Sequence, residues 1–205
     1  MSITEQTDWS TNSNNQAIDI HELTPKSFEV LARLNIPRIA KFEKVSYEQF
    51  KKDMIKQFGS VFEENEEVIK SIYDDIKLPA RATKDSAGYD FFAPLSIKPT
   101  PTSGIVIPTG IRCKMTPGWV LKMYPRSGQG FKYGVHLFNT TGIIDGDFYF
   151  ADNEGHIMVK LSSKTECDVI PKGQGFCQGI FSQYGITEDD DVDGIRTGGF
   201  GSTSK

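Results

Sequence analysis

The chain has 205 residues, 24% of them charged, and a formal net charge of -4 at neutral pH. This length predicts one main domain with a core of its own, and the acidic balance argues against a nucleic-acid polymer as partner. No apolar run approaches the roughly 20 residues that a membrane span needs, and the polar start "MSITEQTDWSTNSNN" has no signal-peptide core. We therefore expect a cytoplasmic protein with no membrane partner.

The first 36 residues are expected to form a flexible N-terminal tail. Residues 1 to about 22 are rich in Ser, Thr, Asn and Gln, a composition that buries too little apolar surface to offset the entropy of ordering. Thr24 and Pro25 fit the N-cap and first position of a short helix that would reach Leu34.

In the next part of the chain, the spacing of the apolar residues changes from strand-like to helical. Residues 37–46, "PRIAKFEKVS", are a candidate first strand. Between about 47 and 77 the apolar residues recur at helical spacing, which predicts two amphipathic helices separated by Gly59 and Ser60. Their apolar stripes are expected to face the core.

From Leu78 onward, Pro and Gly interrupt short segments about every ten residues, which predicts many short antiparallel strands. The strand candidates are residues 104–115, 118–127, 135–145, 156–163 and 167–181. In one of them Ile157, Val159 and Leu161 alternate with Met158 and Lys160, the pattern of a half-buried strand. The fold class expected is all-β, a jelly-roll-like or distorted β-barrel over residues 37–195, with an α-helical insert near the N-terminus.

Three cysteines, Cys113, Cys167 and Cys177, are widely spaced and form no CxxC pair. This usage indicates reduced thiols rather than a disulfide scaffold or a zinc site, and Cys177 is expected to pack as a small apolar residue.

The acidic run Glu188–Asp193 has the alternating carboxylates that begin an EF-hand loop. The twelfth loop position would be Phe200, which cannot supply the bidentate carboxylate that calcium needs. We therefore expect a solvated linker, which makes residues 196–205 a mobile C-terminal arm.

Two stretches offer groups that bind anions or metals. "SAGYD" places Asp90 close to a glycine, which fits a site residue or an exposed turn aspartate. "YPRSGQG" brings together the guanidinium of Arg126, the hydroxyl of Ser127 and glycine-freed amides, which can cradle an anion or form a simple turn.

Two further stretches carry carboxylates and an amide. In "NTTGIIDGDF", Asp145 and Asp147 follow a β-branched pair at a strand end, so they can be a base beside a stabilising group or a polar turn. In "GQGFCQGIF", Gln178 lies among small residues, where an outward-facing polar strand residue is the alternative.

Taken together and in this order, the stretches resemble the five motifs of the trimeric dUTP diphosphatase (dUTPase) family: "AGYD", "PRSG", "NTTGIIDGD", "GQGFCQGIF" and "RTGGFGST". The resemblance covers roughly residues 78–205. It implies hydrolysis of dUTP to dUMP and pyrophosphate, with Mg²⁺ on the triphosphate and a water that attacks the α-phosphorus. It also implies a homotrimer whose sites lie at subunit boundaries.

The resemblance implies a role for each matching residue. Asp145 would orient and deprotonate the water, and Asp90 would hold Mg²⁺ through coordinated water. The implied substrate contacts are phosphate binding by Arg126, Ser127, Gly128 and Gln178, recognition of uracil and deoxyribose by Asn139, Gly142 and Phe148, and closure of the arm through Arg196, Phe200, Gly201, Ser202 and Thr203. Within the arm, Phe200 would stack on uracil while Arg196 reaches the γ-phosphate.

Several positions depart from the family pattern. Phe148 stands where the family usually has tyrosine, and Gly175 where it commonly has arginine. Residues 149–154 predict an extended hairpin tip, and His156 after it is expected to be structural. The helical insert is a candidate to cover the barrel flank, contact a neighbouring subunit or bind a regulatory protein.

Two other functions remain open from the sequence. A dCTP deaminase shares the fold but needs a glutamate acid/base, whereas this chain has "GIIDGD". A nucleotide-gated regulatory binding protein, with the insert or the hairpin tip as its partner surface, could coexist with turnover.

Overall fold

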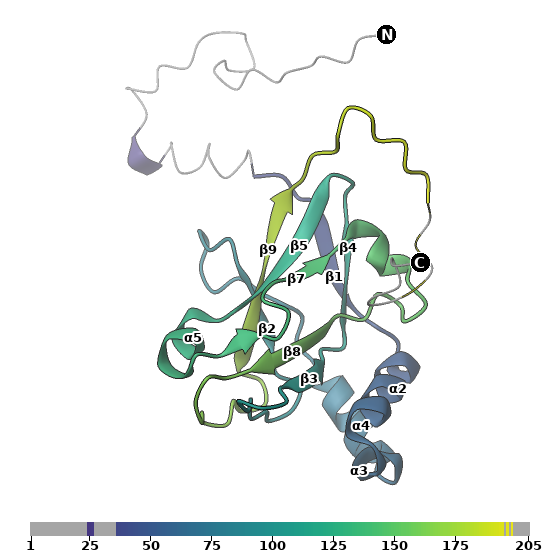
Figure 1. Cartoon of the computed structure of the whole chain (residues 1–205), viewed down its shortest axis with the longest axis vertical. Helices are drawn as coiled ribbons and strands as arrows, with labels where there is room; N and C mark the ends of the chain where they lie inside the picture. Colours follow the sequence, from purple (N-terminus) through teal and green to yellow (C-terminus); the bar gives the residue numbers. More distant parts are fainter. Residues whose placement is uncertain (1–23, 27–35, 195, 197, 199–205) are drawn as a thin grey trace. The chain divides into compact units, whose positions relative to one another are not determined.

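The structure is a computed structural model that describes residues 24–26, 36–194, 196 and 198 (Figure 1). The chain forms two compact units, 1–38 and 39–205. In the first unit Pro25 and Lys26 are helical, as expected, and Leu34 lies outside the described residues. No helix in the described ranges is long and apolar enough to cross a membrane.

The second unit begins with a strand and three helices. β1 (Ala40–Lys44) pairs antiparallel with β4 (Ile111–Met115), which confirms the predicted first strand. α2 (Tyr47–Phe58) begins after Ser46, whose side chain accepts a hydrogen bond from the Gln49 amide at 3.1 Å, a standard N-cap. It ends at Gly59, where φ is 65° and glycine avoids the clash of a Cβ.

The remaining helices follow directly. α3 (Ser60–Glu63) and α4 (Glu66–Asp74) pack with α2, and Figure 1 shows the three together beside β3. Phe50 and Met54 of α2 and Ile69 of α4 are fully buried. Helices with buried apolar side chains thus occupy the segment where the sequence predicts them, and Ser60 begins a third short helix instead of separating two.

The other strands form two antiparallel sheets. The four-stranded sheet has the order β2 (Tyr89–Phe92), β9 (Gly175–Gln183), β5 (Trp119–Pro125) and β7 (Gly142–Ile144). The three-stranded sheet has the order β3 (Ile105–Pro108), β8 (Met158–Ser162) and β6 (His136–Leu137). Every predicted strand segment contains a strand, and the mostly β architecture with antiparallel sheets is confirmed.

The core agrees with the alternating pattern read from the sequence. Ile157, Val159 and Leu161 are at most 2% exposed, while Met158 and Lys160 between them are half-buried. This alternation turns one face of β8 toward the core. The three cysteines are free and buried, as expected, and burial raises the pKa of Cys113 to about 12.

The predicted hairpin tip at 149–154 is wrong. Gly146–Phe150 forms a 3₁₀ helix, η2, and the following turn folds back against it. A Cβ on Gly155 would lie 2.6 Å from the Phe148 carbonyl oxygen, so only glycine permits this close approach. Phe148 and Ala151 are buried beneath the turn, and their burial holds the segment on the core.

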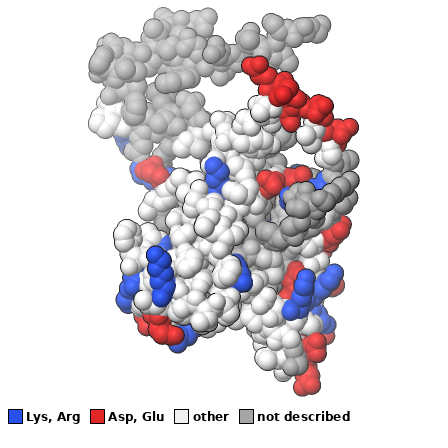
Figure 2. Space-filling view, viewed as in Figure 1, with Lys and Arg blue, Asp and Glu red and all other residues white. Residues whose placement is uncertain are grey.

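The acidic run after β9 is exposed, as expected for a solvated linker. Residues 188–194 have no helix or strand. Their carboxylates lie at the upper right of Figure 2, along the yellow segment of Figure 1.

Candidate active site

Three predicted site residues meet where β2, β5 and β9 lie side by side. Gln178 of β9 is paired with Asp90 of β2 on one side and with Tyr124 of β5 on the other. Arg126 follows directly after β5, and its Nε lies 3.3 Å from Asp90 Oδ1. Gln178 Nε2 donates to the Pro125 carbonyl oxygen at 3.3 Å. We call Asp90, Arg126 and Gln178 the Asp90 cluster.

Two glycines make room for this cluster. A Cβ on Gly88 would lie 2.5 Å from Gln178 Oε1. A Cβ on Gly175 would lie 2.6 Å from Arg126 Nη1, which also donates to the Gly175 carbonyl oxygen at 3.5 Å. The glycine that departs from the family pattern at position 175 therefore leaves space for the Arg126 guanidinium, a role that sequence reasoning missed.

A second group forms where β7 ends. Asp145 lies at the N-cap position of η2 with its side chain 50% exposed, and Asp147 is 55% exposed. Arg196 Nη2 lies 3.2 Å from Asp145 Oδ2, and Arg196 Nε lies 3.5 Å from Asp147 Oδ1. We call Asp145, Asp147 and Arg196 the Asp145 cluster. Its guanidinium partly neutralises both carboxylates, a pairing within one chain that the motifs did not predict.

Phe148 lies beneath the Asp145 cluster. Its ring is 2% exposed, and the Arg196 guanidinium carbon is 5.5 Å from the ring centroid, within the range of a cation–π contact. The flat side chain expected under the deoxyribose is therefore part of the core, and Arg196 lies against it.

The loop between β6 and β7, two strands of different sheets, carries the residues expected to recognise uracil. Asn139 is exposed at its tip, and Thr140 adopts φ 65° with its amide donating to the Leu137 carbonyl oxygen at 2.9 Å. Gly142 is buried, and a Cβ there would lie 3.0 Å from Met123 Cβ on β5. A larger residue at this position would therefore need Met123 to shift.

The other predicted residues are divided between a short helix and the arm. Ser127 and Gly128 begin α5 (Ser127–Tyr133). Phe200, Gly201, Ser202 and Thr203 lie outside the described residues. Within the described part of the chain, no hydrogen bond or ion pair joins the Asp90 cluster to the Asp145 cluster.

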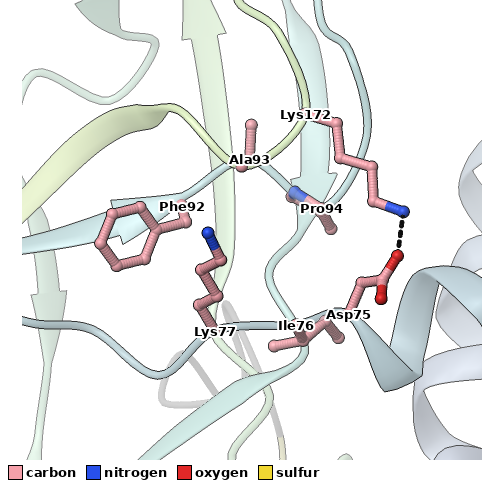
Figure 3. Close-up of a pocket in the computed structure, with 8 residues that line it drawn as sticks. Asp75, Ile76, Lys77, Phe92, Ala93, Pro94 and Lys172 are labelled. Atoms are coloured by element: carbon pink, nitrogen blue, oxygen red, sulfur yellow. Dashed lines mark hydrogen bonds and ion pairs between the residues drawn. The ribbon is translucent and has the colours of Figure 1, made fainter.

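A cavity of about 370 Å³ is lined by residues outside both clusters. Its lining comprises Phe92 at the end of β2, Ala93 and Pro94 after it, residues that follow α4, and Lys172, which forms an ion pair with Asp75 at 2.6 Å (Figure 3). A second cavity of about 320 Å³ lies between α5 and residues 167–171. None of the predicted site residues lines either cavity, so neither is the candidate active site.

The carboxylates also limit how a metal can be held. Among the residues that the structure describes, no group of three His, Cys, Asp or Glu side chains could hold an ion. Asp90 is 18% exposed and already has the Arg126 guanidinium as its counter-ion. A single carboxylate suits an ion that keeps most of its water, as Mg²⁺ does, better than an ion enclosed by protein ligands.

Comparison with known proteins identifies the family. Residues 74–204 match the family model described as dUTPase. The deoxyuridine 5'-triphosphate nucleotidohydrolase of Lactococcus lactis is 41% identical over 132 residues, 62% of this chain and 88% of that protein. The protein of the same name from Hahella chejuensis is 34% identical over 145 residues, 65% of this chain and 91% of that protein. A solved dUTPase from Streptococcus mutans aligns with a TM-score of 0.48 and 34% identity, covering 54% of this chain and 88% of that one. The family match extends over more than half of the chain and contains both clusters, so this chain belongs to the dUTPase family.

Proposed function

We propose that this protein hydrolyses dUTP to dUMP and pyrophosphate, and so limits uracil incorporation into DNA and supplies dUMP for thymidylate synthesis. The observation that carries the proposal is the match of residues 74–204 to the dUTPase family, because this range contains every residue with an assigned role.

Asp145 is the proposed general base. Its carboxylate is half exposed at a strand end, where a water can reach it. In the free chain Arg196 lies against this carboxylate, and a triphosphate offers the guanidinium several anionic oxygens in exchange. Arrival of substrate would therefore release Asp145 to take a proton from water while Arg196 binds phosphate.

The Asp90 cluster is the proposed phosphate site. Arg126 presents a partly exposed guanidinium, Gln178 an amide, and Ser127 with Gly128 the first residues of α5. Asp90 would hold Mg²⁺ through coordinated water, and the ion when bound would neutralise charge on the phosphates. The single described carboxylate beside one guanidinium supports this outer-sphere role.

The β6–β7 loop and the arm are proposed to select the nucleotide. Asn139 and the backbone near Gly142 would pair with uracil, where a wrong base leaves buried polar groups unpaired. The Phe148 ring would lie under the deoxyribose once Arg196 leaves it, and Phe200 would stack on the base as the arm closes.

The protein is proposed to act as a homotrimer with a jelly-roll-like core. The two clusters form no polar contact within the described part of one chain, which fits a site shared between subunits. The exposed side chains of Phe131 in α5, Phe138 in the β6–β7 loop and Ile143 in β7 are apolar surface that a neighbouring subunit could cover. The free, buried cysteines support a reducing, cytoplasmic compartment.

α2 and α3 precede the family match and α4 ends at residue 74, where the match begins, which supports the interpretation of these helices as an addition to the family core. A regulatory protein partner on this segment stays a prediction.

The test is pyrophosphate release from the four common deoxynucleoside triphosphates and dUTP, measured for the wild type and for Asp145→Asn. We expect turnover of dUTP alone and a loss of at least about a hundredfold in the variant, because the amide cannot accept the proton. An ammonia assay with dCTP separates the deaminase alternative. Equal rates for wild type and Asp145→Asn would refute the assigned base.

A further inference from the structure

The segment that follows Asp145 is held by residues that precede the family match. Around η2 and in the turn after it, backbone bonds join residues three apart: Phe148 N to Asp145 O at 3.2 Å, Ala151 N to Phe148 O at 3.1 Å, Glu154 N to Ala151 O at 2.7 Å and His156 N to Asn153 O at 3.0 Å. Bonds of this 3₁₀ type have poorer geometry than α-helical ones, so contacts from outside the segment help to fix its shape. The support comes from β1 and α2.

Glu154 is the main point of attachment. Its Oε2 accepts from the Ser46 amide at 2.7 Å, and its Oε1 accepts from the Ser46 hydroxyl at 2.6 Å. Desolvation raises the pKa of Glu154, but the hydrogen bonds from the Ser46 side chain and backbone outweigh it and hold the pKa below its usual value. The acceptor is therefore a carboxylate at neutral pH, and both bonds are charge-assisted.

Glu154 also has an unfavourable backbone. Its φ is 57°, in the left-handed region that residues with a Cβ rarely adopt. Such a conformation persists where surrounding contacts outweigh its cost, and here the two bonds to Ser46 do so.

Ser46 is itself fixed. Its hydroxyl oxygen accepts the Gln49 amide as the N-cap of α2, and α2 is anchored in the core by Phe50 and Met54. One hydroxyl thus caps the helix and donates to the turn after η2. The shape of that turn depends on where α2 lies.

A second attachment lies two residues further along. His156 Nε2 accepts from the Gly110 amide at 2.8 Å, so this nitrogen carries no proton and the ring is neutral. Nδ1 then carries the proton and donates to Asp53 Oδ2, on α2, at 2.6 Å. His156 is fully buried, as expected of a structural residue.

A third attachment reaches η2 itself. The Tyr149 hydroxyl donates to Glu43 Oε2, on β1, at 2.7 Å, and the Arg112 guanidinium carbon lies 4.5 Å from the centroid of the Tyr149 ring. Glu43, Ser46 and Asp53 all precede residue 74, where the family match begins. All three bind the segment that starts at the proposed base.

The mechanical link to Asp145 is short. Gly155 is packed so closely on Phe148 and Tyr149 that a Cβ would approach the Phe148 carbonyl oxygen to 2.6 Å and Tyr149 Cα to 2.7 Å. The Phe148 amide in turn donates to the Asp145 carbonyl oxygen. A displacement of Glu154 therefore passes through η2 to the backbone of Asp145.

We propose that Ser46 is a positioning residue for the reaction: by holding Glu154 it fixes η2 and, through η2, Asp145. The helical segment before the family region is then part of the active-site frame. This inference rests on the proposed function, since Asp145 is the base that is positioned.

The test uses two variants of equal size, Ser46→Asp and Ser46→Asn. Both side chains cap helices as well as serine does. Asparagine can donate a hydrogen bond to Glu154, whereas aspartate repels its carboxylate. With dUTP as substrate, we expect Ser46→Asp to lower kcat about tenfold or more with KM within about twofold, because small displacements of a reacting group are costly. Ser46→Asn should keep kcat within about threefold of the wild type.

Two further variants show whether the effect passes through Glu154. Glu154→Gly removes the carboxylate and accepts φ 57° without strain, so it should lower kcat while leaving the melting temperature within about 2 °C of the wild type. Adding Ser46→Asp to Glu154→Gly should cause no further loss of kcat. The control is Lys51→Ala, which removes the 2.7 Å ion pair between α2 and Glu66 of α4, touches neither Ser46 nor Glu154, and should leave kcat unchanged.

A readout without substrate separates this inference from the proposed function. Hydrogen exchange at the amides of Phe148 and Ala151 should be faster in Ser46→Asp and Glu154→Gly than in the wild type and Lys51→Ala. If the wild type turns over no dUTP, the proposed function fails, and the exchange rates still decide whether Ser46 holds η2. Equal kcat values for Ser46→Asp and Ser46→Asn, or unchanged exchange at η2, would overturn the inference. Should Ser46→Asp fail to fold, Glu154→Gly decides by the same two measurements.

Discussion

The two ends of the segment from Asp145 to His156 are held in different ways. At the start, Asp145 and Asp147 are half exposed and have one guanidinium, that of Arg196, as their described ion-pair partner. At the end, Glu154 and His156 are bonded to groups fixed in the core, the capped start of α2 and the Gly110 amide.

This difference separates contacts that a ligand can replace from contacts that it cannot. The Arg196 side chain is 14% exposed and its guanidinium pairs with half-exposed carboxylates, so phosphate oxygens could take the place of these carboxylates with charge pairing kept. At the other end His156 is fully buried and Glu154 is half-buried, and their bonds to the protein keep the backbone in one place while Asp145 changes partners. The same segment can thus be rigid in position and open to substrate.

The largest expected effect comes from removing a buried side chain of η2. Phe148 is 2% exposed, so Phe148→Ala should lower the free energy of unfolding by about 3–5 kcal/mol, since a cavity replaces the ring. Phe150, two residues later in η2, is 72% exposed. Phe150→Ala should therefore change the free energy of unfolding by less than about 0.5 kcal/mol. Urea denaturation at one protein concentration measures both. Similar losses in the two variants would contradict the burial of only one of these rings.

The fold was predictable where the pattern is local. The alternation at Ile157 to Leu161 and the helical period after residue 46 each follow from how the backbone turns side chains toward one face. The segment 149–154 was not predictable in this way. Its shape depends on a bond between Ser46 and Glu154, 108 positions apart, which leaves no periodic signal in either stretch.

The candidate site was likewise predictable from the sequence in one part and not in the other. The motifs identified Asp90, Arg126 and Gln178, and register pairing between neighbouring strands brings these three together. The pairing of Asp145 with Arg196, 51 positions apart, could not be read from spacing, because the linker between β9 and Arg196 fixes no geometry. Opposite charge at the two motifs was the one signal available for it.

An effect of intermediate size is expected in the pH dependence of the free energy of unfolding. A hydrogen bond from Lys41, followed by one from Tyr149, lowers the pKa of Glu43 to about 2 from its ordinary 4.5. Since the folded-state pKa is the lower one, this carboxylate contributes stability that is fully present above about pH 4.5 and is lost as the pH falls toward 2. The side chain is 25% exposed, so we expect a contribution of only about 1 kcal/mol after solvent screening.

The measurement is the free energy of unfolding against pH. Glu43→Gln should remove this part of the acid loss between pH 4.5 and pH 2, and Tyr149→Phe, which removes one of the two donors, should remove less. Parallel curves for Glu43→Gln and the wild type over this range would show that the carboxylate does not hold η2.

The smallest expected effect lies at the exchangeable end. Arg196→Gln removes a guanidinium whose partners are two half-exposed carboxylates, and the amide side chain keeps part of the packing of Arg196, which is 14% exposed, so the free energy of unfolding should fall by about 0.5 kcal/mol or less at low salt. Salt near 1 M should remove even this difference, because it screens exposed charges within about 3 Å. A loss above about 2 kcal/mol that persists in salt would place Arg196 among the fixed contacts, through its position over the Phe148 ring. A small, salt-sensitive loss would mean that Asp145 is positioned from the Glu154 end alone, because the contact at its own end is too weak to hold it.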